Sequence, residues 1–396
     1  MGFSFENEIN ELLERGVATV VPSKGELKKE LLSGKKLNIY LGIDPTAKNI
    51  HLGHAFLLRK LNKLVELGHA VTFLIGDFTA LIGDSSDKMS ERPILTPEEI
   101  RANFKSYKSE AEKFLDFKKV KIAYNSDWLK KLNLEEVIKV VREFSLNDFI
   151  GRELIKKRLS AGSHIRLDEA LYPVLQGYDS YFLDTDLQLG GADQIFNMQA
   201  GRILQKNYRG KESYILSVEY LLGTDGRKMS KSWGNAIWLS DSPSEIYGKV
   251  MSANDDLIIT YYTLATNLTL EEVENKNQRL KKGENPMILK KELARRIVGE
   301  IYSDEKAEEA ETEFENTFQK RDLPEDAQTY EIKGKETLAE ILLFSGTVKS
   351  KSEIKRLIES GAIEINGVTA KNLDITPEPN KETKIKVGKR RFLRIK

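Results

Sequence analysis

The chain has 396 residues, of which 40% are hydrophobic, 31% are charged and none is cysteine. A chain of this length is expected to form two to four domains, and the lack of cysteine excludes disulfides, zinc sites with thiolate ligands and thiol nucleophiles. The sequence contains no uninterrupted apolar run of about 18 residues and does not start with the basic-then-apolar pattern of a signal peptide, so we expect a cytoplasmic enzyme without a membrane span.

The net charge of +1 is unevenly distributed along the chain. Residues 333–396 hold 15 Lys and Arg against 8 Asp and Glu, a balance of +7 that leaves −6 for the remainder. A basic unit on an acidic body indicates a polyanionic partner, although an ordinary solvated surface can have the same composition.

Helical and strand patterns alternate in the first half of the chain. Residues 1–32 are predicted to be helical and amphipathic. The short apolar runs at 37–43, 70–75 and 120–124 predict buried strands, and the apolar stripe of 53–67 predicts a helix between the first two. Further alternation to about residue 217 predicts an α/β fold of the Rossmann-like, doubly wound parallel type.

The second half of the chain has a different pattern. Long charged helical segments from 242 to about 323 predict an α-helical domain, and the charged stretch 319–326 predicts a linker. Helices are then predicted near 337–345 and 351–360, and Asn366-Gly367 predicts a hairpin turn. The expected division is an N-terminal helical segment 1–32, a Rossmann-like catalytic domain 33–222, a lysine-containing loop with the helical domain 223–325, and a small basic α+β domain 333–396.

The first chemical motif is His51-Leu52-Gly53-His54, between the first predicted strand and its helix. Ligands of parallel sheets bind beyond the carboxyl ends of strands, and a helix N-terminus favours phosphate. Gly53 has no Cβ and lets a base or a phosphate approach the backbone, while the imidazoles can donate hydrogen bonds to phosphoryl oxygens. Taken alone, two incidental loop histidines explain the motif equally well.

The second motif is Lys228-Met229-Ser230-Lys231-Ser232, which follows a glycine-containing segment and a predicted strand at 213–218. A mobile loop with two lysines can close over a polyphosphate and neutralise leaving pyrophosphate in the transition state. A basic surface loop is the simpler reading of this motif in isolation, but the two motifs together are far more specific.

Together the two motifs resemble the HIGH and KMSKS signatures of class I aminoacyl-tRNA synthetases, with Leu52 in place of isoleucine. The resemblance implies that an amino-acid carboxylate attacks the α-phosphate of ATP, supplied with Mg²⁺, and that the acyl group then passes to tRNA. Segments 40–47, 171–179 and 190–194 resemble the pocket of the tyrosyl-tRNA synthetases, which implies L-tyrosine and tRNA(Tyr) as substrates.

The resemblance also implies roles for individual pocket residues. Tyr172, Gln176 and Asp84 are expected to hold the α-amino group of tyrosine, and Tyr40 and Asp179 its phenolic hydroxyl. The spacing of Tyr172, Gln176 and Asp179 places them on one helix face, although ordinary half-buried helix residues can share this spacing. A pocket that bonds the hydroxyl rejects phenylalanine because buried polar groups would be left unpaired, an effect for which tyrosyl-tRNA synthetases are the standard example.

Further residues are implied to bind ATP or the adenylate. The resemblance places Asp44 near the adenylate, Asp193 near the ribose and Gln194 beside both substrates. It places Thr46, Gly53, His51 and His54 at the phosphates. It also places Lys88, Arg92, Lys228 and Lys231 at pyrophosphate. A solvated face is the competing reading of Lys88 and Arg92. No covalent nucleophile, general base or protein-held metal is expected, because the substrate carboxylate is already charged. Leu41 stands where many of these enzymes carry a small polar residue, so a ribose contact there must come from the backbone or from elsewhere.

The C-terminal residues carry a second resemblance. Segment 353–367 resembles a small RNA-binding module shared with a ribosomal small-subunit protein, and residues 381–396 hold eight basic side chains and one acidic. Phosphate contacts from such a surface give affinity more than sequence choice. The family pattern further implies that the helical domain reads the anticodon region and that the protein is a homodimer.

Three alternatives remain open on the sequence alone. A tryptophanyl-tRNA synthetase would lack the Tyr40 and Asp179 pair and usually the basic domain. A nucleotidyltransferase of the HxGH type acting on a small molecule would lack the RNA module and would rarely hold a full lysine motif. An RNA-binding protein with an inactive core would not need intact histidines and lysines.

Overall fold

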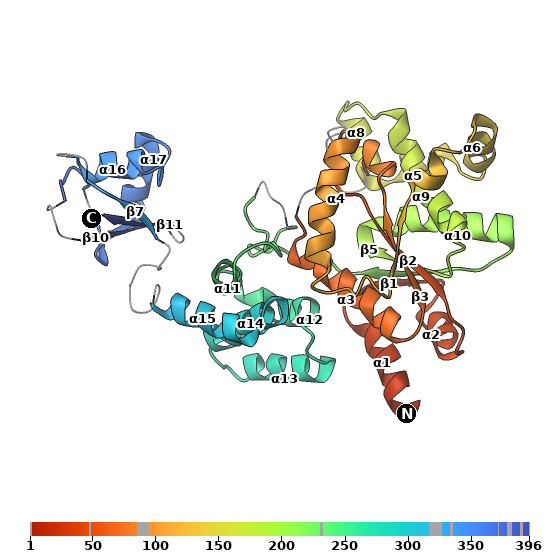
Figure 1. The fold of residues 1–396 in the computed structure, drawn as a ribbon, viewed down its shortest axis with the longest axis horizontal. Helices are drawn as coiled ribbons and strands as arrows, with labels where there is room; N and C mark the ends of the chain where they lie inside the picture. Colours follow the sequence, from red (N-terminus) through yellow and green to blue (C-terminus); the bar gives the residue numbers. More distant parts are fainter. Residues whose placement is uncertain are drawn as a thin grey trace.

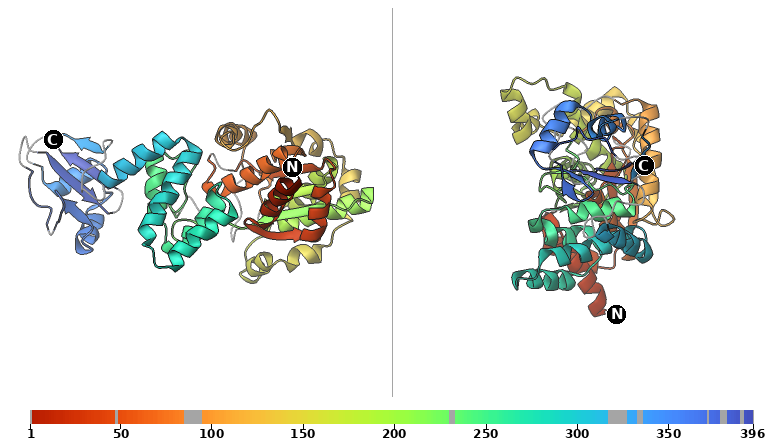
Figure 2. Two further views of the ribbon diagram at one scale, coloured as in Figure 1. Left: turned by 90° about the horizontal axis from the view of Figure 1, so that it is seen from below. Right: turned by 90° about the vertical axis from the view of Figure 1, so that its left-hand side faces the viewer.

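The computed structural model describes residues 2–46, 49–84, 95–229, 233–316, 327–332, 336–370, 372–377, 382–388 and 391–395. The described residues form three units that follow one another along the longest axis of the molecule (Figures 1 and 2). A sheet unit comes first, a purely helical unit lies in the middle, and a small mixed unit lies at the far end.

The sheet unit is built on six strands in the order β1-β6-β5-β2-β3-β4. Their bounds are β1 (Val17–Val21), β2 (Asn38–Ile43), β3 (Ala70–Ile75), β4 (Lys121–Tyr124), β5 (Leu187–Gly191) and β6 (Tyr214–Val218). Strands β2 to β6 pair in parallel, so the predicted parallel sheet is confirmed. Their carboxyl ends therefore meet at one edge of the sheet.

The prediction that residues 1–32 are entirely helical is wrong for β1. Helices α1 (Gly2–Glu14) and α2 (Lys24–Leu32) form as expected, but Val17–Val21 between them pairs antiparallel with β6, with Val21 opposite Ile215. A run of five residues between two helices has no clear periodicity of its own. Its conformation is determined by a partner strand almost 200 residues away, because tertiary pairing overrides weak local preference.

Helices cover both faces of the sheet. Alternate side chains of a strand point to opposite faces, so Ile39 and Leu41 join the main core with α3 (Leu52–Glu66), whereas Tyr40 joins a separate cluster with Trp128. On the Tyr40 side lie α9 (Leu167–Phe182) and α10 (Ile195–Arg209), which pack along each other. This two-sided cover leaves the carboxyl edge of the sheet as the place where loops from both faces meet.

Further elements complete the sheet unit. They are η1 (Thr79–Leu81), α4 (Pro97–Ala111), α5 (Ser126–Leu129), α6 (Leu134–Val141), α7 (Leu146–Gly151), α8 (Glu153–Ser160) and η2 (Ala192–Gln194). Helix α4 begins after Thr96, whose side chain accepts from the Glu99 N–H while the Glu99 carboxylate accepts from the Thr96 N–H. This reciprocal capping box satisfies two otherwise free donors of the helix.

The helical unit packs against the sheet unit. It consists of α11 (Pro243–Met251), η3 (Asp255–Leu257), α12 (Ile258–Ala265), α13 (Leu270–Lys281), α14 (Pro286–Ile301) and α15 (Asp304–Phe314). Its buried side chains, such as Tyr261 and Ile297, belong to the same core as α3. At its edge the Arg15 guanidinium, just after α1, donates to four backbone carbonyls around the end of α12, those of Tyr262, Thr263, Thr266 and Leu268.

The small C-terminal unit has its own hydrophobic core. It contains β7 (Gln328–Tyr330), α16 (Leu338–Phe344), α17 (Lys351–Glu359), β8 (Ile363–Ile365), β9 (Val368–Thr369), β10 (Thr383–Val387) and β11 (Arg391–Ile395). Asn366 and Gly367 have φ angles of 49° and 81° between the paired strands β8 and β9, which confirms the predicted hairpin turn. Among the described residues of the whole chain, no helix is both long and apolar enough to cross a bilayer.

Candidate active site

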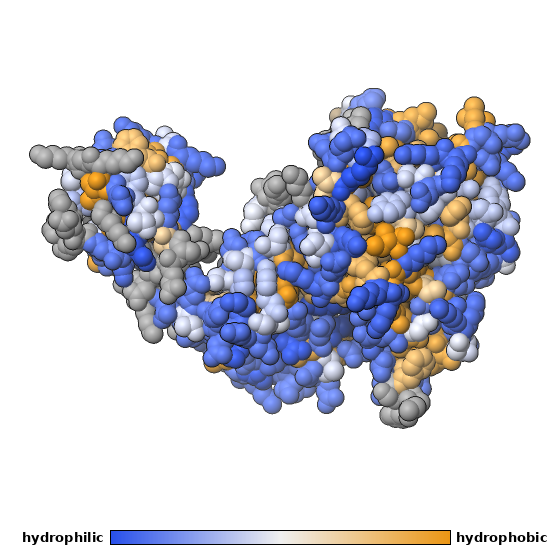
Figure 3. Space-filling model, viewed as in Figure 1, coloured by the Kyte–Doolittle hydropathy of each residue, from blue (hydrophilic) through white to orange (hydrophobic). Residues whose placement is uncertain are grey.

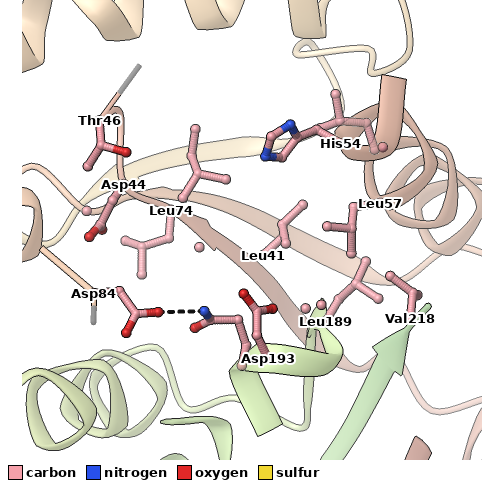
Figure 4. A pocket seen from close by; sticks show the side chains of 18 of the residues that line it. Leu41, Asp44, Thr46, His54, Leu57, Leu74, Asp84, Leu189, Asp193 and Val218 are labelled. Atoms are coloured by element: carbon pink, nitrogen blue, oxygen red, sulfur yellow. Dashed lines mark hydrogen bonds between the residues drawn. The ribbon is translucent and has the colours of Figure 1, made fainter. Parts of the chain in front are cut away.

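A cavity of about 750 Å³ opens at the carboxyl edge of the parallel sheet, between the start of α3 and helix α9 (Figure 4). It brings together thirteen of the residues that the sequence singled out: Tyr40, Asp44, Thr46, His51, Gly53, His54, Asp84, Tyr172, Gln176, Asp179, Asp193, Gln194 and Lys228. Lys88, Arg92 and Lys231 lie outside the described residues. Residues that lie far apart in the sequence, from Tyr40 to Lys228, therefore line one cavity.

Tyr40 and Asp179 lie deep in this space and are 3% and 2% exposed. The Tyr40 hydroxyl donates to Gln188 Oε1 at 3.2 Å. The Asp179 carboxylate accepts from Trp128 Nε1 at 2.7 Å and from Asn125 Nδ2 at 3.1 Å. Burial raises the pKa of Asp179 to about 8, and the two donors act against this rise because they favour the ionised form. Burial likewise raises the pKa of Tyr40, so its hydroxyl stays protonated.

A second network surrounds Asp44, which directly follows β2. Its Oδ2 accepts from the Tyr172 hydroxyl at 2.9 Å and its Oδ1 from Thr79 Oγ1 at 2.8 Å. Asn125 Nδ2 also donates to Thr79 Oγ1, at 3.0 Å, and thus links this network to Asp179. Gly76 is required beside it, because a Cβ at that position would lie 2.0 Å from Asp44 Oδ1. The tyrosine ring of α9 and the aspartate of the sheet are thereby held together.

Asp84 and Gln194 close another side of the cavity. Gln194 Nε2 donates to Asp84 Oδ2 at 2.7 Å, the bond drawn in Figure 4. Gln194 Oε1 accepts in turn from Asn197 Nδ2 at 3.1 Å, which fixes which end of the amide faces Asp84. Asp193 lies next to them, and a Cβ on Gly191 would come within 2.7 Å of its carboxylate. Backbone and carboxylates are therefore closely spaced on this wall.

The two histidines lie at the start of α3, where His51 occupies the N-cap position. Their ring centroids are 3.9 Å apart, and the rings of Trp238 and Tyr107 flank them. Burial lowers the pKa of His51 and lowers that of His54 to about 4, with Lys228 adding to both shifts, so both imidazoles are neutral at pH 7. Neither Nδ1 has a hydrogen-bond partner among the described residues. The pair thus places two neutral imidazoles at the start of α3, with both Nδ1 atoms buried.

Distant segments hold the backbone around His51. Leu52 N donates to Ile237 O and Leu239 N donates to Ile50 O, each at 2.9 Å, so this turn pairs with the chain that follows the lysine motif. From α4, the buried Glu110 carboxylate accepts from Ile50 N at 2.7 Å. These bonds fix the start of α3 from two sides.

The first lysine of the second motif lines the cavity from the segment that follows β6. Lys228 forms an isolated bridge with Leu222, and its Nζ lies 5.2 Å from the centre of the Tyr220 ring. Asn235, which is 3% exposed, donates from Nδ2 to Lys228 O at 3.1 Å and to Asp225 Oδ1 at 2.7 Å. One amide thus joins the two ends of the segment that contains the motif.

Leu41 lines the cavity and is 3% exposed as part of the main core. Its side chain has no polar atom, so any sugar contact on this wall comes from neighbouring groups. Gly190, Gly191 and Asp193 line the same cavity and supply backbone groups and a carboxylate.

Several site residues were missed by the sequence reasoning. Asn125 directly follows β4, and a polar residue at the carboxyl end of a parallel strand is a usable signal. Trp128, Gln188, Glu110 and Trp238 have no such signal. Each acts through a partner at least 51 residues away in the chain, and only the folded arrangement identifies them.

Known proteins match this chain over most of its length. Residues 32–319 match the family model of tRNA synthetases class I (W and Y). The chain is 42% identical to the tyrosine--tRNA ligase of Carboxydothermus hydrogenoformans, over 97% of both chains, and 39% identical to that of Thermotoga maritima, over 97% of this chain and 96% of the relative.

Solved structures share the fold. A C-terminally truncated mitochondrial tyrosyl-tRNA synthetase of Coccidioides posadasii aligns with a TM-score of 0.62 at 25% identity, covering 77% of this chain and 91% of that one. A tyrosyl-tRNA synthetase of Archaeoglobus fulgidus complexed with L-tyrosine aligns with a TM-score of 0.61 at 24% identity, covering 77% and 99%. From the full-length identity, the family match and the site described above, the chain belongs to the class I tRNA synthetases and, within them, to the tyrosine--tRNA ligases.

Proposed function

We propose that this protein attaches L-tyrosine to tRNA(Tyr) in two ATP-dependent steps, in the cytoplasm where translation takes place. The observation that carries the proposal is the buried Tyr40 and Asp179 pair in a cavity that the start of α3 also lines. A phenol hydroxyl can donate to a carboxylate and accept from another hydroxyl at the same time. The relatives named tyrosine--tRNA ligases support the same substrate.

Tyrosine fits the cavity in one orientation. Its phenolic O–H donates to Asp179 and thereby adds a third donor that favours the ionised carboxylate, and its phenolic oxygen accepts from the Tyr40 hydroxyl, which turns away from Gln188. Its ammonium group faces Tyr172, Gln176 and Asp84, on the walls formed by α9 and the loop after η1. Its carboxylate is then directed towards the histidines at the start of α3.

ATP occupies the remainder of the cavity. The ribose lies at Asp193, with the backbone of Gly190 and Gly191 in place of a polar side chain at position 41. The phosphates lie at Thr46, Gly53, His51, His54 and Lys228, and Lys88, Arg92 and Lys231 join them as further cations. Mg²⁺ enters with the phosphates as part of the substrate complex and neutralises part of their charge.

Activation needs no protein nucleophile or base. A carboxylate oxygen of tyrosine attacks the α-phosphorus, the bond from that phosphorus to the bridging oxygen of the β-phosphate breaks, and pyrophosphate leaves. Neutral imidazole N–H groups and lysine ammonium groups stabilise the charge that develops on the phosphoryl oxygens. Neutral histidines are suited to this role because they donate hydrogen bonds without holding the product anion as tightly as a cation would.

Transfer to tRNA completes the reaction. A hydroxyl of the terminal ribose attacks the carbonyl carbon of the adenylate, and AMP leaves. The C-terminal unit, with the excess of basic side chains in residues 333–396, binds RNA phosphates, and the helical unit contacts the anticodon region. Such phosphate contacts make binding weaken as salt concentration rises.

A homodimer is part of the proposal. Large apolar side chains are exposed on α6, α7 and the start of α9, with Leu134, Leu146 and Leu167 at 74%, 59% and 79% exposure. Figure 3 shows hydrophobic atoms at the tip of the sheet unit that carries α6. Burial of such a surface against a second copy stabilises a complex. Sedimentation equilibrium is expected to give twice the chain mass, and Leu167→Glu to shift it towards the monomer.

The test of the function is amino-acid-dependent exchange of labelled pyrophosphate into ATP, measured with each amino acid in turn. We expect exchange with tyrosine alone. Exchange driven by tryptophan and not by tyrosine would contradict the specificity, and no exchange with any amino acid would contradict the activity itself.

A further inference from the structure

The base of the lysine motif is tied to the helical unit by two hydrogen bonds. The Tyr261 hydroxyl, on α12, donates to the carbonyl of Leu222 at 2.8 Å. The backbone N–H of Asn254, just before η3, donates to the carbonyl of Thr224 at 3.0 Å. Both acceptors lie in the segment between β6 and Lys228, so elements further along the chain fix the segment from which the motif begins.

The link continues from Leu222 to Lys228. The two residues form an antiparallel bridge, and Gly223 N donates to Arg227 O at 2.7 Å in the turn between them. A displacement of Leu222 is therefore carried to the backbone of Lys228 through the bridge. The neighbouring Leu221 and Lys228 itself line the cavity.

We propose that Tyr261 is a positioning residue for ATP activation: it acts through the Leu222 carbonyl, sets the backbone of Lys228, and couples the position of the helical unit to the phosphate end of the site. This inference rests on the proposed function, because it assigns Lys228 to the phosphates. It assigns Tyr261 no contact with substrate. Its consequence is that the unit proposed to contact the tRNA anticodon region also supports the geometry of the first chemical step.

The hydroxyl, rather than the ring, is the group that this inference concerns. Tyr261 is fully buried in the main core, and phenylalanine would keep its packing and remove only the donor. The Leu222 carbonyl would lose its hydroxyl donor, and a partly buried carbonyl that loses its donor tends to shift towards another one. The expected damage is thus local to the segment that leads to Lys228.

The neighbouring Tyr262 provides a matched control. It lies on the same helix, is 1% exposed, and its hydroxyl donates to the carbonyl of Leu289 at 2.8 Å, entirely within the helical unit. Tyr261→Phe and Tyr262→Phe therefore remove the same kind of hydrogen bond from two tyrosines that are both almost fully buried. Only the first bond leads to the lysine motif.

The experiment compares pyrophosphate exchange by the full chain and the two variants, with ATP and tyrosine varied separately, beside thermal unfolding and equilibrium tyrosine binding. We expect Tyr261→Phe to lower kcat for tyrosine-dependent exchange by about three- to ten-fold, the equivalent of one net hydrogen bond, with unchanged tyrosine affinity. Tyr262→Phe is expected to show a similar loss of thermal stability and wild-type exchange.

Each other result overturns a separate statement. The positioning role would be refuted if both variants lost exchange activity equally, or if neither lost any. A loss of tyrosine affinity in Tyr261→Phe would refute it as well. If the unchanged protein shows no tyrosine-dependent exchange, the proposed function fails first and this inference fails with it.

Discussion

Replacing Asp179 with asparagine tests the assignment of the phenol pocket. The two side chains have nearly the same shape, but asparagine has one acceptor oxygen where aspartate has two. In the structure both oxygens of Asp179 are used, by Trp128 Nε1 and by Asn125 Nδ2. Asn125 cannot simply turn its amide, because its Oδ1 accepts from Phe78 N at 2.9 Å and its Nδ2 also donates to Thr79. The new NH₂ group must therefore face a donor.

The size of the effect follows from the lost interaction with the substrate. A hydrogen bond from the phenol to a buried carboxylate contributes about 1.5–3 kcal/mol, so kcat/KM for tyrosine is expected to fall about 10- to 150-fold. Phenylalanine has no hydroxyl and loses no such bond. The ratio of kcat/KM for tyrosine to that for phenylalanine should fall by nearly the same factor.

Pyrophosphate exchange with both amino acids measures this ratio. Asp186→Asn is a suitable control, because Asp186 is also buried, at 5% exposure, and accepts from Asn38 N at 2.7 Å near the opposite end of the sheet, away from the cavity. It should cost stability without changing the ratio. Equal losses for tyrosine and phenylalanine in Asp179→Asn would refute the assignment of the phenol to this carboxylate.

Three further predictions concern the phosphate site and the RNA. Lys231→Ala is expected to slow adenylate formation about 100-fold, the effect of removing one group that stabilises developing charge, with little change in tyrosine affinity; a large loss in tyrosine titrations would refute the assigned role. Deletion of residues 333–396 should impair tRNA charging and spare exchange, and equal loss of both would count against an RNA-binding role. The pKa of His54 is lowered to about 4 in the folded protein, against about 6.5 in the unfolded chain, so the folded protein binds fewer protons. The contribution of the neutral His54 to stability is therefore complete above pH 6.5 and is lost as the pH falls towards 4. Urea unfolding of His54→Gln should therefore depend less on pH in this range than wild type, and an unchanged pH dependence would contradict the burial of a neutral imidazole.

The sequence predicts those parts of the fold that have a regular local pattern. Strands β2 and β3 and helix α3 carry clear periodicity, and the helical face of Tyr172, Gln176 and Asp179 follows from spacing alone. Strand β1 was missed because Val17–Val21 is too short to show a period and becomes a strand only beside β6.

The functional site likewise contains residues that the sequence reveals and residues that it does not. Motif residues such as His51 and Lys228 are found because they stand in short runs whose order is informative. Gln188 and Trp128 are not found, because an isolated glutamine in an apolar strand or a tryptophan in a short helix carries no local sign of its partner. Their roles depend on side chains 148 and 51 residues away, and such distances become contacts only after the sheet has formed.

The backbone pairing between Ile50–Leu52 and Ile237–Leu239 has a consequence for the order of folding. Contacts between residues so far apart in the chain form late, because closing a long loop costs entropy before the contact is made. The phosphate end of the site is thus completed only when residue 239 is in place, well after β2 and α3 can pack together. A fragment that stops at residue 222 would contain the parallel sheet and the pocket for the amino acid, yet its histidine turn would lack backbone partners. We would expect such a fragment to retain some tyrosine binding and to be unable to activate it.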